Sequence, residues 1–258
     1  MAAAQKVILV IGAGRGIGAT VGARFAKEGY TPCLVRRSNE KILNESVEAI
    51  KKVTNNDAHG FLMDATEISQ VNELVEKIES TVGPIEVCVY NLGANMGPRD
   101  LSNTPPHVFE KAWKLGAWGG FLVSKAVLPR MEERGRGTFL FTGATAGLRG
   151  NMGQLAHSGG MFARRGMAMS LAHEFWPKGI HVAHIPVDGL VDAPDTVGKF
   201  FPEMFEKAKS ENEAIENIVK PVDVAETYWH IHSQSRGCWT FELDLRPWKD
   251  TAWFNSNY

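Results

Sequence analysis

The sequence has few of the features that mark secreted, membrane-spanning or nucleic-acid-binding proteins. Its 258 residues include only three cysteines, an odd number spaced too widely for a disulfide framework or a zinc site (Cys33, Cys88 and Cys238). No apolar run approaches the ~20 residues of a membrane helix, and the first residues lack a secretory apolar core of about 7–15 residues. A net charge of −1 gives no basic excess for nucleic acid. We therefore expect a soluble, cytoplasmic protein with reduced thiols and with neither a membrane nor a nucleic acid as partner.

Metal-ligand spacing and internal boundaries are missing as well. His230 and His232 do not have helical metal-ligand spacing, and no cysteine accompanies them, so we expect no metal site. No repeat, linker or low-complexity tract divides the chain. An apolar content of 44% is ample for one large core. The sequence therefore predicts a single domain over residues 1–258.

The most informative stretch that is present is Val7–Gly18, VILVIGAGRGIG. An apolar run stops at a series of glycines, and a pattern of small apolar residues typical of a helix follows. A strand, a tight glycine turn and a helix N-terminus in this order can bind the pyrophosphate of a dinucleotide, because the backbone approaches the phosphates closely and offers free N–H groups. The alternative is a purely structural turn. The residues expected to bind the cofactor here are Gly12, Gly14, Arg15, Gly16, Ile17 and Gly18.

Strand and helix patterns alternate along the rest of the chain. After a first strand from Val7, apolar runs predict strands at Thr31–Arg36, Ala58–Met63, Ile85–Tyr90, Thr138–Thr142 and Ile180–Pro186, and alternation predicts a last strand at Trp239–Leu245. Helical spacing covers Glu40–Val53, Ile68–Val82, Val108–Glu133 and Gly153–Trp176, and the segment Gly189–Lys220 is left unassigned. Repeated strand–helix units with continuously apolar strands predict an α/β fold, a Rossmann-like doubly wound parallel sheet covered on both faces.

The glycine spacing, Gly12-x3-Gly16-x-Gly18, resembles that of the short-chain dehydrogenase/reductase family. Further motifs extend the resemblance over almost the whole chain: FLMDAT, the turn NLGA, and the segments GGFLVSKAVLPRM, GTFLFTGATAG and PKGIHVAHIPVDG. In that family an Asp at the position of Asp64 contacts the adenine. The resemblance implies further cofactor contacts at Asp64, Ala65, Asn91 and Gly93. We also expect a homo-oligomer, a dimer or tetramer, and interpret Trp113, Trp118, Met152, Phe162 and Trp176 as core or subunit-packing residues.

Charge at the end of the second strand indicates the cofactor. An NAD enzyme usually has an acidic residue there that bonds the ribose 2′-hydroxyl. Arg36 and Arg37 stand there instead, and with Arg15 in the glycine turn they suit a 2′-phosphate, which arginine can hold with two parallel hydrogen bonds. The alternative is a solvated basic turn. We predict NADP(H) as the cofactor.

The catalytic positions are where the sequence departs from the family. The family acts through Ser, Tyr and Lys, with an Asn on the preceding helix. An ungapped alignment puts Ala144 at the Ser position, His157 at the Tyr, Met161 at the Lys and Gly116 at the Asn. These four replacements remove the Tyr that donates the proton, the Lys that lowers the pKa of that Tyr and the Ser that bonds the substrate oxygen. They argue against ordinary ketone reduction or alcohol oxidation.

Two polar residues remain catalytic candidates. His157 titrates near neutrality and can replace Tyr as acid or base, or it is simply a polar residue of its helix. Asp188, in the apolar stretch HIPVDGLV, either faces the cofactor and substrate or bonds its own turn. The pair Gly159-Gly160 inside a predicted helix indicates either a pocket enlarged for a bulky substrate or close helix packing.

Three functions are compatible with an intact glycine turn beside an altered catalytic set. The first is an NADPH-dependent reductase of an imine or iminium in secondary metabolism, similar to the reductases and cyclases of fungal alkaloid pathways that lack the tetrad. The second is a non-catalytic NADP(H)-binding or partner protein. The third is a carbonyl reductase that uses His157 in place of Tyr. We favour the first, with a bulky small molecule as substrate.

Overall fold

Six parallel strands form the central sheet of the computed structural model, which describes residues 5–95, 97–199, 201–210 and 218–249. The strand order is β3-β2-β1-β4-β5-β6, so the direction of winding reverses between β1 and β4. That reversal is where doubly wound sheets bind their ligands, outside the carboxyl ends of the strands. The strands are β1 Lys6–Ile11, β2 Tyr30–Arg36, β3 His59–Leu62, β4 Ile85–Tyr90, β5 Gly137–Ala144 and β6 Ile180–Val187.

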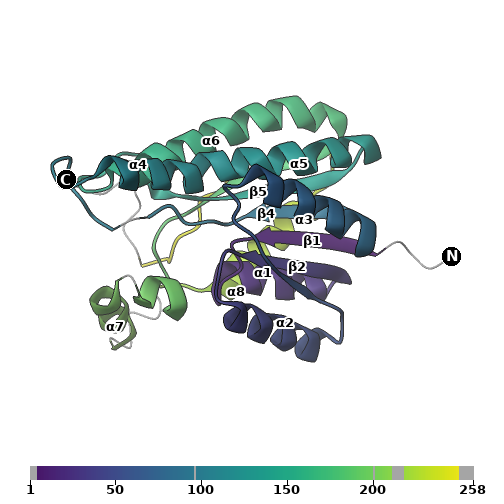
Figure 1. Cartoon of the computed structure of the whole chain (residues 1–258), viewed down its shortest axis with the longest axis horizontal. Helices are drawn as coiled ribbons and strands as arrows, with labels where there is room; N and C mark the ends of the chain where they lie inside the picture. Colours follow the sequence, from purple (N-terminus) through teal and green to yellow (C-terminus); the bar gives the residue numbers. More distant parts are fainter. Residues whose placement is uncertain (1–4, 96, 200, 211–217, 250–258) are drawn as a thin grey trace.

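Helices cover both faces of the sheet (Figure 1). One face carries α1 (Ile17–Ala26), α2 (Glu40–Thr54) and α8 (Pro221–His232). The opposite face carries α3 (Ile68–Thr81), α5 (Gly119–Arg134) and α6 (Leu155–Phe175). The predicted Rossmann-like, doubly wound α/β fold is thus confirmed as a single domain.

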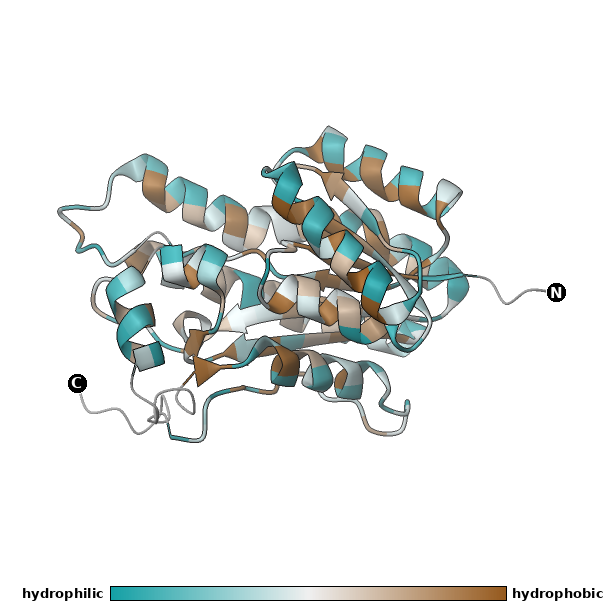
Figure 2. Cartoon of the chain, turned by 90° about the horizontal axis from the view of Figure 1, so that it is seen from below, coloured by the Kyte–Doolittle hydropathy of each residue, from teal (hydrophilic) through white to brown (hydrophobic). Residues whose placement is uncertain are grey.

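Two apolar cores explain why β1 is apolar from Val7 to Ile11. In β1, Leu9 packs into the core under α3, α5 and α6, whereas Val10 packs into the core under α1, α2 and α8. Both side chains are fully buried. Successive residues of a strand face opposite sides, so burial of both faces requires apolar residues at every position. Figure 2 shows the complementary pattern in the helices, which have hydrophobic and hydrophilic sides.

The long helix expected at Val108–Glu133 is present but not uniform. It consists of α4 (Pro106–Trp113), a π-helical turn η1 (Lys114–Trp118) and α5. A π-helical turn widens the helix locally and is found frequently at functional sites. This one carries Gly116, the position where the family resemblance expects an Asn.

The predicted last strand, Trp239–Leu245, is wrong. The segment runs beside β6 but makes only isolated bridges, which pair Glu242 with His184 and Leu245 with Val187. A half-buried extended chain alternates apolar and polar residues whether or not its backbone pairs continuously. The alternation therefore indicated a half-buried extended segment, but it did not show whether the backbone of that segment pairs continuously with β6.

The unassigned segment Gly189–Lys220 contains short elements beyond β6. They are β7 (Leu190–Val191), a π-helical turn η4 (Pro194–Gly198), α7 (Pro202–Ser210) and β8 (Ile218–Val219). Its residues 200 and 211–217 lie outside the described residues, as do residues 1–4, 96 and the aromatic tail 250–258. Within the described part of the chain, no helix is long and apolar enough to cross a lipid bilayer.

Candidate functional site

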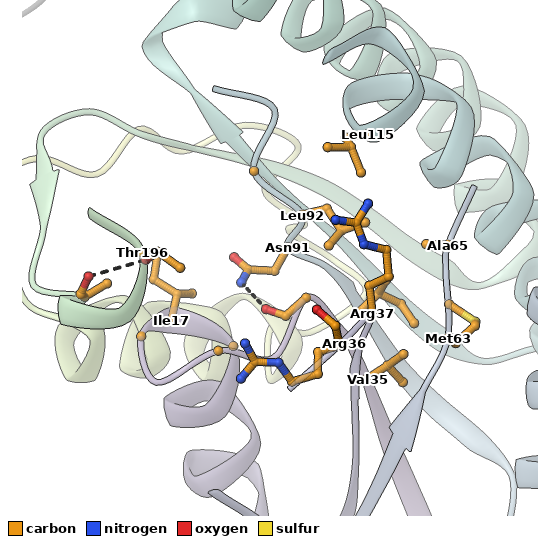
Figure 3. Close-up of a pocket in the computed structure, with 18 of the residues that line it drawn as sticks. Ile17, Val35, Arg36, Arg37, Met63, Ala65, Asn91, Leu92, Leu115 and Thr196 are labelled. Atoms are coloured by element: carbon orange, nitrogen blue, oxygen red, sulfur yellow. Dashed lines mark hydrogen bonds between the residues drawn. The ribbon is translucent and has the colours of Figure 1, made fainter. Parts of the chain in front are cut away.

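A cavity of about 440 Å³ opens at the carboxyl ends of the strands, where the winding reverses (Figure 3). Its wall contains the glycine turn after β1, the ends of β2, β3 and β4, one residue of η1, and part of the segment after β6. Its lining residues include Ile11, Gly12, Gly14, Gly16, Ile17, Gly18, Val35, Arg36, Arg37, Ser38, Met63, Asp64, Ala65, Asn91, Leu92, Gly93, Leu115, Val191, Ala193, Thr196 and Val197.

Close backbone packing holds the glycine turn. Gly12 has a φ of +92°, and a Cβ atom there would meet the backbone of Asn91 at 2.9 Å. The Asn91 side chain donates to the Gly12 carbonyl at 3.0 Å, which ties the end of β4 to the turn. Gly16 provides no side-chain cap to α1, so the first N–H groups of this helix are available to an anion.

Arg36, the last residue of β2, and Arg37, which follows it, face different parts of the cavity. Arg36 extends toward the glycine turn and Arg37 toward Leu115 (Figure 3). The Nη1 atom of Arg36 is buried and has no hydrogen-bond partner among the described residues. Burial lowers the pKa of Arg36, while Asp195 and Arg15 act on it in opposite directions. A buried guanidinium nitrogen without an acceptor fits an anionic group such as a phosphate.

Most of the predicted cofactor residues come together in this wall, but Arg15 does not. Its guanidinium turns away to pair with Glu45 and, through Nε, with Asp195 at 3.4 Å. Asp64 lines the cavity, and its carboxylate accepts hydrogen bonds from the Thr66 backbone and side chain at 2.9 and 2.7 Å. Sequence reasoning missed the contribution of the segment after β6, for example Thr196, because no motif or periodicity marks that segment.

His157 lies in the first turn of α6 and is not part of the cavity wall. Burial, with the positive charge of Arg164 as second cause, lowers the pKa of His157 to about 4 despite a hydrogen bond to the Ala94 backbone. The Nδ1 atom is buried and without a described partner. The imidazole is therefore neutral at pH 7, and it provides no imidazolium proton to a substrate oxygen in the cavity.

Asp188 does not face the cavity, contrary to one of the two interpretations of the sequence. Its carboxylate accepts a hydrogen bond from the Thr145 hydroxyl and pairs with Arg246, with 3.0 Å between Oδ2 and Nη1. Both side chains of the ion pair are largely buried. The carboxylate thus joins the ends of β5 and β6 to the C-terminal segment, and its charge is compensated by the protein itself.

The pair Gly159-Gly160 has two different surroundings, and close helix packing explains Gly160. A Cβ atom at Gly160 would lie 2.7 Å from the carbonyl oxygen of Ala112, and one at Gly116 would lie 2.6 Å from the Cα atom of Gly160. Gly159 faces the ring of Phe109. The expectation of an enlarged pocket is therefore not supported at Gly160, whereas Gly159 lines a second cavity, of about 560 Å³, together with Phe109 and Phe162.

The remaining predictions concern packing and metal residues. Trp118 and Trp176 pack against the core, whereas Met152 is 98% exposed. His232 is held by Tyr30 and Thr138, each at 2.8 Å. The described residues contain no group of three or more His, Cys, Asp or Glu side chains suited to a metal ion.

Comparison with known proteins gives the family. The model for short chain dehydrogenases matches residues 6–198. The chain belongs to this family. The 3-ketodihydrosphingosine reductase of Bos taurus is 28% identical over 179 residues, which cover 68% of this chain and 53% of that protein. This short-chain dehydrogenase thus spans about half the length of that curated relative.

Solved structures of short-chain dehydrogenases have the same fold. One from Rhodopseudomonas palustris is 32% identical, with a TM-score of 0.78 over 94% of this chain and 99% of the other. A metagenomic short-chain oxidoreductase solved in complex with NADP is 19% identical, with a TM-score of 0.77 over 94% and 97% of the two chains. The latter likeness concerns the fold alone.

The positions that the family resemblance assigns to catalysis lie in one region of this short-chain dehydrogenase. Ala144 ends β5, His157 and Met161 lie on α6, and Gly116 lies in η1. Met161 is buried against Ala146 and its apolar neighbours. The buried guanidinium of Arg164, one helical turn beyond Met161, bonds the carbonyl of Gly116 at 2.7 Å.

Proposed function

We propose that this short-chain dehydrogenase is an NADP(H)-dependent reductase of a carbon–nitrogen double bond that is already activated as an iminium. The observation that carries the proposal is the place of His157, which stands at the position of the family's proton donor but is not part of the cavity wall. Burial also lowers the pKa of His157 to about 4. Reduction of a ketone needs a proton for the developing alkoxide. When bound, NADPH supplies a hydride to the iminium carbon, and the double-bond electrons pass to nitrogen to leave a neutral amine.

The cavity supports the cofactor part of the proposal. The uncapped N-terminus of α1 suits a pyrophosphate, and the buried, unpartnered Nη1 of Arg36 suits a 2′-phosphate. Arg37 supplies a second positive charge to the same wall. The chain's own contribution to the rate is then orientation of substrate and cofactor, which can account for several kcal/mol of barrier lowering.

The resemblance to the reductases and cyclases of fungal alkaloid pathways extends the proposal to substrate class. A bulky alkaloid precursor of secondary metabolism would carry its own positive charge, and a shaped cavity can also favour its cyclisation. This extension rests on the shared fold and on the four replaced positions.

A matched substrate pair tests the proposed reaction. The N-methyl-3,4-dihydroisoquinolinium ion is permanently charged, and 1-tetralone is a ketone of the same ring size. We expect the full chain to oxidise NADPH with the iminium, above the rate without protein, and not with the ketone. Equal or faster turnover of the ketone would overturn the proposal.

A second candidate is an NADP(H)-binding protein without turnover. The observation that favours it is the buried positive charge of Arg164 behind the cavity wall, which disfavours a cationic substrate. In this case NADPH binds but neither member of the substrate pair is reduced. A carbonyl reductase that relies on His157 is the least compatible with the structure, because the imidazole is neutral at pH 7.

We also propose that the chain forms a homo-oligomer through the outer face of α4, α5 and α6. Large apolar side chains on this face are each about 40–51% exposed: Phe109, Trp113, Phe121, Leu155, Phe162 and Met169. A two-fold contact would bury the same patch on both copies. Light scattering on Phe162→Glu should show a smaller mass than on the unmodified chain, whereas Val53→Glu, on exposed α2, should not change the mass.

A further inference from the structure

Arg164 is an unusual residue to find in the interior of the protein. It is 1% exposed, and its guanidinium lies 4.8 Å from the centre of the Tyr90 ring. Its nitrogens donate to carbonyl oxygens of four residues, Gly116 at 2.7 Å, Thr142 at 2.5 Å, Leu92 at 2.7 Å and Leu115 at 3.0 Å. The fork of donors therefore joins β4, β5 and η1 behind one wall of the cavity.

These hydrogen bonds satisfy the donors of Arg164 but leave its charge uncompensated. Among the described residues, no carboxylate oxygen pairs with this guanidinium, whereas Arg165, the next residue of the same helix, pairs with Glu242 at 2.7 Å. Carbonyl dipoles reduce the cost of burying a cation but do not cancel its field. A fixed positive field therefore extends into the space next to Arg164.

That space is the candidate cofactor cavity. Leu92 and Leu115 both line it, and both offer their carbonyl oxygens to the same nitrogen, Nη2 of Arg164. The hydroxyl of Tyr90 bonds the Leu115 carbonyl at 2.7 Å and helps to fix this wall. The guanidinium is thus separated from the cavity by one layer of residues.

We infer that Arg164 is the positioning residue of the cofactor wall and that its buried charge makes the cavity prefer reduced NADPH to oxidised NADP⁺. The inference rests on the proposed NADP(H) site. NADPH carries one more net negative charge than NADP⁺, because the oxidised nicotinamide ring is a cation. A uniform positive field from within the protein therefore stabilises the reduced form more than the oxidised form.

The expected effect is large enough to measure. A unit difference in charge within roughly 10 Å of a fixed charge, at an effective dielectric constant of about 20, changes affinity by about tenfold, or about 1.4 kcal/mol. The preference also has a consequence for turnover, since a reductase that binds NADP⁺ weakly releases its oxidised cofactor readily.

The test is the ratio of the dissociation constants of NADP⁺ and NADPH, measured on the full chain. NADPH binding is followed by its fluorescence, and NADP⁺ binding by competition with NADPH. The unmodified chain should bind NADPH about tenfold more tightly. In Arg164→Gln the ratio should fall several-fold, whereas in Arg164→Lys, which keeps the charge but loses the planar fork, both forms should bind more weakly at a nearly unchanged ratio.

The matched control is Arg165→Gln, which removes one positive charge from the same helix. Arg165 is paired with Glu242 and does not line the cavity. The ratio of the NADP⁺ and NADPH dissociation constants of Arg165→Gln should therefore equal that of the unmodified chain. If Arg164 only supports the fold, Arg164→Gln should lose affinity for NADPH and for NADP⁺ by the same factor. That result would overturn the inference. If Arg164→Gln does not fold, equal affinity of the unmodified chain for the two forms is sufficient to overturn it. Absence of binding by either form would instead refute the cofactor proposal on which the inference rests.

Discussion

At the scale of single residues, the candidate cofactor cavity and the two catalytic candidates, His157 and Asp188, are held by contacts between parts of the chain that are distant in the sequence. Gly12 and Asn91 each stand in a short motif that the sequence shows, but the contact between them joins the ends of β1 and β4. The pKa of His157 depends first on its burial and then on Arg164, and the charge of Asp188 is compensated by Arg246, which lies far along the chain. An ion pair between residues far apart in the sequence, such as Asp188 with Arg246, leaves no pattern in the sequence, so only the structure shows it.

The first prediction concerns Arg36. Arg36→Ala should weaken NADPH binding at least about tenfold and NADH binding by little, because a charge-assisted hydrogen bond to the 2′-phosphate contributes roughly 1.5–3 kcal/mol. Calorimetry with both cofactors measures the two effects. Lys52→Ala, on the exposed side of α2, serves as the control for a lost positive charge. Equal affinities of the unmodified chain for NADPH and NADH would contradict the proposal that Arg36 binds the 2′-phosphate.

The second prediction concerns Asp188. Because its carboxylate pairs with Arg246 inside the fold, Asp188→Asn should lower the free energy of unfolding by about 1–3 kcal/mol. NADPH affinity should change little. Urea denaturation and fluorescence titration give the two quantities. A stable variant that has lost only iminium turnover would show that the carboxylate acts on the substrate after all.

At the scale of secondary-structure elements, apolar continuity predicted β1, β2, β4, β5 and β6 because these strands are buried on both faces, whereas the predicted edge strand β3 is half-exposed. It did not predict η1, in which Gly116 packs against Gly160 and offers its carbonyl oxygen to Arg164. These residues are far apart in the sequence. The same long-range contact explains why a glycine stands in mid-helix at a position that would otherwise favour alanine.

The third prediction uses two glycines of α6. Gly160→Ala places a Cβ atom 2.7 Å from the Ala112 carbonyl oxygen and should destabilise the protein by about 1–3 kcal/mol. Gly166→Ala meets nothing within 4 Å and should be neutral or stabilising by up to about 1 kcal/mol. Denaturant midpoints of the two variants, measured side by side, check the difference. Similar midpoints would contradict the close helix packing described above.

At the scale of the whole molecule, buried histidines connect stability to pH. Burial is the main cause that lowers the pKa of both His157 and His232 to about 4, below the ordinary value of about 6.5. In the unfolded chain these groups take up protons as the pH falls through 6.5, whereas in the folded chain they do not until about pH 4. The unfolded state therefore gains protons first.

The fourth prediction follows from that difference. The free energy of unfolding should change little through these groups above about pH 6.5 and should decrease as the pH falls from 6.5 toward 4. Urea denaturation across this range measures the slope, and His157→Phe should make it shallower. A slope unaffected by that substitution would show that His157 is protonated equally in both states.

The most direct test of the account is the pH dependence of hydride transfer to a permanent iminium. The single-turnover rate of the full chain with bound NADPH and N-methyl-3,4-dihydroisoquinolinium is measured by stopped flow from about pH 6 to 9, with 4-deuterated NADPH to identify the chemical step. The account predicts an isotope effect and a rate that is independent of pH, since no protein group donates a proton and the pKa of His157 lies below the range. A rate that follows the ionisation of one group, together with reduction of 1-tetralone, would contradict it.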